Sequence, residues 1–90
     1  MLYLVSYTLD PPRAALNIEE ELKKSAGWWH HLDFTWIIAT QESIDEFYKR
    51  LAIRFLDTDH FFIVEITSNS RWHGWLPNRA WEWLDHNRYY

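Results

Sequence analysis

The chain has 90 residues, seven of them tryptophan, with no cysteine and a formal charge of −4. The absence of cysteine excludes a disulfide framework and a thiol nucleophile, and it fits a reducing compartment. The acidic balance disfavours a protein held to nucleic acid chiefly by phosphate contacts. Residues 1–10 hold no basic segment and too short an apolar run for a signal peptide or a membrane span. The sequence therefore predicts a cytoplasmic, single-domain protein that does not enter a membrane.

The first third of the chain predicts a strand followed by a helix. Residues 2–8 alternate with apolar side chains on both faces, which is typical of a strand buried on two sides. Asn17 followed by Glu20 has the spacing of a capping box, so we expect a helix from about 14–17 to 25. Gly27 is expected to end that helix as its C-terminal cap.

The middle of the chain predicts a hairpin, a second helix and a last strand. Residues 28–41 are too long and too evenly apolar for one strand, and Asp33 is a suitable turn residue. Ser43 and Glu46 form a second capping box. The helix that follows has apolar residues at the spacing of one face: Ile44, Phe47, Tyr48, Leu51 and Phe55. Residues 60–67 read as a strand that is again apolar on both sides.

The order βαββαβ predicts an α+β fold, a ferredoxin-like sandwich of four antiparallel strands with both helices on one face. We expect the core of this single domain in residues 1–68, with 69–90 as an extension. Because the strands are apolar on both faces, something must cover the second face. Pro77 suits the first turn of an amphipathic, Trp-rich C-terminal helix whose apolar arc could do so: Ala80, Trp81, Trp83 and Leu84.

The tryptophans are interpreted as core and interface residues. The candidates for an interface are Trp29, Trp36, Trp72, Trp75, Trp81 and Trp83. Since the hairpin indoles alternate between sheet faces, at least one of them should contact the C-terminal extension or a second subunit. A rival interpretation is a single-strand nucleic-acid binder in which bases stack on exposed rings beside Arg71, Arg79 and Arg88. That binder would depend on an exposed Trp75 or Trp83 and would weaken steeply with salt.

Catalytic chemistry has one candidate location, the end of the first strand, where Tyr7, Asp10 and Arg13 leave the sheet. A two-fold axis could pair two Asp10 carboxylates around Mg²⁺ or Mn²⁺, with Tyr7 and Arg13 contacting phosphate in a metal-dependent nuclease. The simpler interpretation is that Asp10, directly before two prolines, is a turn residue. No other metal site is predicted, because His30 and His31 are adjacent on a strand and point to opposite faces.

Five stretches carry a resemblance to a known family. They are "LYLVSYTL" at 2–9, Gly27-Trp28-Trp29-His30, Phe34-Thr35-Trp36-Ile37-Ile38, "FFIVEIT" at 61–67, and Gly74-Trp75-Leu76-Pro77 with Trp81-x-Trp83-Leu84. Together they resemble the SinR-like family of small bacterial and phage proteins over nearly the whole chain; the label is unrelated to the helix-turn-helix repressor of that name. That family is similar in turn to the ferredoxin-like CRISPR-associated adaptation subunit and to VapD-type toxin ribonucleases.

The resemblance implies a homodimer and a metal-assisted nuclease ancestry. In those relatives an aspartate directly follows the aromatic residue at the end of the first strand. Here Thr8 follows Tyr7 and the nearest carboxylate is Asp10, and two residues along a strand span about 6–7 Å. We therefore expect a homodimeric interaction module without robust catalysis, with a role beside nucleic-acid-handling machinery or in phage and defence systems. The metal-dependent nuclease and the single-strand binder are the alternatives.

Overall fold

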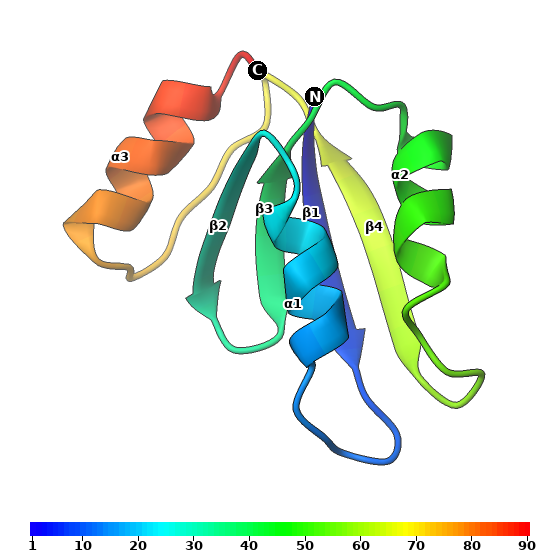
Figure 1. Cartoon of the computed structure of the whole chain (residues 1–90). Coiled ribbons are helices and arrows are strands. Elements are labelled where there is room, and N and C mark those ends of the chain that lie inside the picture. Colours follow the sequence, from blue (N-terminus) through cyan, green and yellow to red (C-terminus); the bar gives the residue numbers. More distant parts are fainter.

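The computed structural model describes all residues, 1–90, as an α+β fold with a four-stranded antiparallel sheet and three helices (Figure 1). The elements in chain order are β1 Leu2–Thr8, α1 Leu16–Lys23, β2 Gly27–Leu32, β3 Thr35–Ala39, α2 Ile44–Ala52, β4 His60–Ile66 and α3 Asn78–Asn87. The strand order across the sheet is β2-β3-β1-β4. Element order and strand order are together compatible with a ferredoxin-like arrangement. None of the helices has the length and apolar character needed to cross a membrane.

The first face of the sheet packs against α1 and α2. Alternation along β1 points Tyr3, Val5 and Tyr7 to this face, where all three are buried. The core is completed by residues of both helices and of β3: Ile18, Leu22, Phe47, Leu51, Trp36 and Ile38. The Tyr3 ring stacks on Phe47 with centroids 5.4 Å apart. Its hydroxyl donates to the carbonyl of Glu42 at 2.8 Å, so the buried polar atom keeps a partner.

The two predicted capping boxes have different outcomes. The box of α2 is confirmed, since Ser43 Oγ accepts from the Glu46 N–H and the Glu46 carboxylate accepts from the Ser43 N–H, both at 3.2 Å. The box of α1 is wrong: the cap position is Ala15, without a side-chain bond. Asn17 lies inside the helix, and its amide donates to the carbonyl of Arg54 at 3.4 Å. The Asn17 side chain, which local spacing assigned to the cap, thus bonds to the segment after α2.

Gly27 is also placed differently from the prediction. It begins β2, and the C-terminal cap of α1 is Lys24. A side chain at Gly27 would bring a Cβ to 3.2 Å from Ala39 Cβ and 3.4 Å from the Trp83 ring. The glycine is therefore explained by the close approach of β3 and α3 to this strand.

A charged network ties α1 to α2. The buried carboxylate of Glu21 accepts from Arg50 at 3.0 Å and from Arg54 at 3.0 and 3.2 Å, while Arg50 also donates to Glu42 at 2.8 and 3.0 Å. Burial by itself raises the pKa of Glu21, but the hydrogen bonds from the two arginines and the nearby Lys24 outweigh it and the pKa is lowered. The hydrogen bond from Arg50 likewise lowers the pKa of Glu42.

The second face of the sheet is covered by the C-terminal extension over β2 and β3. Leu2, Trp29, Ile37 and Ala39 form a second buried cluster with residues of α3, Ala80 and Leu84. Half-buried Trp72, Leu76, Trp81 and Trp83 pack around it. Figure 1 shows α3 and the connector before it on the β2 side of the sheet. The predicted amphipathic C-terminal helix and its covering role are confirmed for this half, which we call the covered half.

Candidate interaction surface

The rest of the second face, over β1 and β4, has no cover from this chain. We call it the open half, and it consists of the alternate residues Leu4, Ser6, Thr8, His60, Phe62 and Val64. Phe62 is 58% exposed and Val64 is 42% exposed. None of the six carries an acidic or a strongly basic side chain, although the chain has 13 acidic and 9 basic residues. Adjacent large apolar side chains on an uncharged surface are typical of an interaction site.

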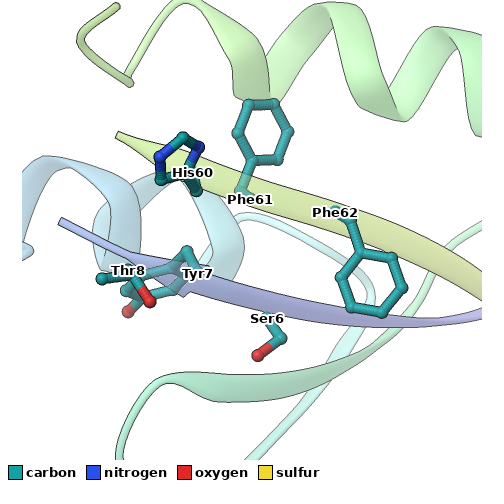
Figure 2. A pocket seen from close by; sticks show the side chains of 6 residues that line it. All are labelled: Ser6, Tyr7, Thr8, His60, Phe61 and Phe62. Carbon is teal, nitrogen blue, oxygen red and sulfur yellow. The ribbon is translucent and has the colours of Figure 1, made fainter. Parts of the chain in front are cut away.

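One end of the open half contains a shallow pocket. Its volume is about 270 Å³, and Figure 2 shows its lining from β1 and β4: Ser6, Tyr7, Thr8, His60, Phe61 and Phe62. Phe61 and Phe62 point in opposite directions from β4, so Phe62 belongs to the open half while Phe61 packs toward the helix side, where it stacks on Phe55 at 4.1 Å. In the register Thr8 lies opposite His60 and Ser6 opposite Phe62. The pocket therefore offers hydroxyl groups, an imidazole and apolar surface.

β4 is also an edge strand, because β1 is its one neighbour in the sheet. Its seven residues pair with β1 in continuous register without a bulge, and they contain no proline or lysine and one carboxylate, Glu65. Natural edge strands are usually protected by such residues or by bulges. The open half thus ends at an edge that is itself suited to contact with another chain.

The predicted catalytic corner is organised around a residue that was not predicted to be part of it, Asp59. Arg13 binds the Asp59 carboxylate through two hydrogen bonds, at 2.7 and 2.9 Å. The backbone N–H groups of Asp10 and Leu56 donate to the same carboxylate at 2.9 and 2.7 Å. The hydrogen bonds from Arg13 hold the pKa of Asp59 well below its usual range. Asp59 therefore joins the β1–α1 loop to the α2–β4 loop.

The three predicted site residues of this corner do not converge on one point. The Tyr7 ring is buried, and its hydroxyl accepts a hydrogen bond from the Trp36 indole at 3.3 Å. Burial raises the pKa of Tyr7. The guanidinium of Arg13 is occupied by Asp59, while the Asp10 side chain is exposed and makes no hydrogen bond or ion pair. The sequence contained Asp59 in its "DTD" segment, but nothing local in that segment indicated a partner 46 residues away.

Of the two carboxylates at this corner, Asp59 is bound by Arg13, and Asp10 is exposed without a partner. No group of three or more His, Cys, Asp or Glu side chains in the structure is placed to hold a metal ion together. Mg²⁺ and Mn²⁺ are bound by several oxygen ligands. The predicted pair of Asp10 carboxylates would require a second copy of the chain.

The predicted interface tryptophans fall into three groups. Trp29 and Trp36 are buried in the two cores, and the Trp29 indole donates to the carbonyl of Ala80 in α3 at 3.3 Å. This contact confirms the expectation that a hairpin indole meets the C-terminal extension. Trp72, Trp81 and Trp83 are half-buried beside the second cluster. Trp75 is 100% exposed on the connector before α3.

Comparison of the chain with protein-family models, with curated proteins and with solved structures finds no match.

Proposed function

We propose that the protein is a homodimeric interaction module of ferredoxin-like architecture, without robust catalysis of its own, in which two copies meet through the open half. The element order and the strand order support the architecture. The single observation that carries the proposal is the open half itself, with exposed Phe62 and Val64 beside Leu4 on a surface that no part of the chain covers.

The charge of the open half favours a second copy as the occupant. In a two-fold contact the same surface is present on both subunits, so any charge near the axis faces a charge of the same sign. Such like-charge contacts are destabilising. The open half has neither carboxylates nor arginine or lysine side chains, whereas the rest of the chain is rich in both. A partner recognised by charge would find no complementary group here.

The chemistry of the open half also fits a sheet-on-sheet contact. Two sheets pack face to face about 10 Å apart, with side chains from both inner faces interdigitating. Phe62 and Val64 stand out from β4 on the same face, with Leu4 opposite Val64 on β1. Burying these groups against their own copies would remove apolar surface from water, which is the main driving force of association.

The experiment is a measurement of solution mass by sedimentation equilibrium. The parent chain of 11.1 kDa should sediment as a dimer. Phe62→Asp combined with Val64→Asp should give a monomer, because two carboxylates would face their copies across the axis. Ile53→Asp is the matched control, since Ile53 is 75% exposed at the end of α2 and lies outside the open half.

Circular dichroism of each variant reports whether the fold is kept. A parent chain that is monomeric at high concentration contradicts the proposal. A well-folded double variant that remains a dimer contradicts the assignment of the contact to the open half.

The resemblance to the SinR-like family supports a role for this dimer beside nucleic-acid-handling machinery or in phage and defence systems. The metal-dependent nuclease is a second candidate, favoured by the exposed Asp10 carboxylate that is free of other partners. It predicts cleavage of short RNA or DNA with Mg²⁺ or Mn²⁺ that is lost in Asp10→Ala and kept in Asp57→Ala, an exposed aspartate outside the corner's hydrogen bonds. Absence of cleavage by a well-folded dimer supports the interaction module.

A further inference from the structure

The largest cavity in the structure lies at the opposite edge of the sheet from β4. Its volume is about 440 Å³, and it is lined by β2 and α3 through Trp28, Trp29, His30, His31, Arg79 and Trp83. Small-molecule sites usually have volumes of about 300–1,000 Å³. Because β2 and β4 are the two ends of the strand order, this cavity is separate from the proposed dimer contact.

The walls of the cavity are mainly aromatic. Arg79 and Trp83 are four residues apart on α3, so both project from one side of the helix toward β2. On β2 the register with β3 shifts between Trp29 and Leu32, and His30 and His31 in this irregular stretch both line the cavity. Flat indole and imidazole rings favour a flat ligand, since aromatic rings interact by offset stacking and edge contacts.

The polar groups of the cavity favour a negative charge on that ligand. None of the six lining residues is acidic. Arg79 is exposed and takes part in no ion pair or hydrogen bond within the chain, unlike Arg13, Arg50 and Arg54. The N-terminus of α3 has no side-chain cap, so its positive end adds to the field of Arg79.

His31 is a second donor for the same ligand. Burial lowers its pKa, and the nearby Arg79 and His30 lower it further. The ring is therefore neutral at pH 7 and can donate one N–H, and it makes no hydrogen bond within the chain. Its ring lies 5.0 Å from that of Trp29 in an edge contact, which holds it beside the aromatic wall.

We infer that the cavity between β2 and α3 binds a small planar aromatic anion, with its ring against the accessible indoles of Trp28 and Trp83 and its anionic group on Arg79 and His31. Two kinds of small molecule have this chemistry, nucleoside monophosphates and aromatic carboxylates. The outer backbone edge of β2 has no strand partner, so its N–H and C=O groups can also meet the polar edge of a nucleobase.

The test is isothermal titration calorimetry of the full chain with four probes: adenosine monophosphate, benzoate, adenosine and inorganic phosphate. Binding of adenosine monophosphate or of benzoate supports the inference and identifies which kind of anion fits. Adenosine and phosphate should each bind at least about tenfold more weakly, because each lacks one of the two features. A charge-assisted hydrogen bond is involved, so Arg79→Gln should weaken binding by about 10- to 100-fold.

Arg71→Gln is the matched control, because Arg71 is an exposed arginine on the connector and does not line the cavity. The monomeric Phe62→Asp, Val64→Asp variant should bind as well as the parent, which separates this inference from the proposed dimer. Failure of both anions to bind overturns the inference. So does equal binding of adenosine, equal binding of inorganic phosphate, or an unchanged affinity in Arg79→Gln.

Discussion

The two halves of the second sheet face are built from the same kind of strand residue but have different surroundings. In the covered half, Ile37 and Ala39 are buried beneath Ala80 and Leu84 of α3. In the open half, Phe62 remains exposed. The difference is one of reach, since α3 and its connector lie over β2 and β3. An apolar strand face thus favours packing against another element. Whether that element belongs to the same chain depends on the path of the chain after the strand.

The largest expected effect is in the covered half. Leu84→Ala should lower the free energy of unfolding by about 2–5 kcal/mol, because it removes a buried side chain and leaves a cavity. Urea denaturation followed by circular dichroism would measure the loss. Leu56→Ala, at an exposed leucine in the α2–β4 loop, should change stability by less than about 0.5 kcal/mol. Equal losses in the two variants would show that α3 does not form a core.

A second effect should appear in the open half and depend on protein concentration. If two copies meet there, dimerisation stabilises the folded chain by mass action, by about 2.7 kcal/mol at a hundredfold excess over the dissociation constant. The parent Tm should therefore rise with concentration, and the Tm of the Phe62→Asp, Val64→Asp variant should not. Calorimetric scans over a hundredfold concentration range would test this. A parent Tm independent of concentration would contradict dimerisation through the open half, and α3 on the covered half would then be the one partner of this sheet face.

Acid should act on neither half of the second sheet face, but on the ion pairs between the helices and on the loops that Asp59 joins. Glu21 and Glu42 have lowered pKa values, so their stabilising contribution is fully present above the ordinary value of 4.5 and is lost as pH falls through the folded-state value. The parent should lose stability below about pH 4.5. Glu21→Gln should be less stable at pH 7 by about 1–3 kcal/mol and should lose less on acidification, because the amide binds no proton. Parallel acid profiles for the two chains would contradict this assignment.

The smallest expected effect on stability is that of replacing the fully exposed Trp75, and its fluorescence distinguishes exposed from buried indoles. Trp75→Phe should change the free energy of unfolding by less than about 0.5 kcal/mol, because the ring is fully exposed. It should nevertheless remove the largest share of the fluorescence that acrylamide quenches, since Trp29 and Trp36 are buried and Trp28 is 42% exposed. Quenching that is unchanged in the variant would place the accessible indole elsewhere on the chain.

Local signals in the sequence predicted much of the fold. The β2–β3 hairpin, with its turn at Asp33, follows from an apolar run that is too long for one strand. The Ser43 capping box begins α2 as expected, and Pro77 immediately precedes α3. These features depend on hydrogen bonds or periodicity within a few residues, so they can be predicted from neighbouring positions in the sequence.

Long-range contacts decided the rest. The Asn17 amide donates to the Arg54 carbonyl and does not cap its own helix. Gly27 is required because Ala39 and Trp83 approach it closely. Arg13, predicted as a phosphate contact, is bound to Asp59, a partner that the sequence did not indicate. The sequence by itself determined that both faces of the sheet would need cover. The tertiary structure decided which half is covered. Coverage depends on the path of the connector from β4 to α3 and not on the composition of any strand.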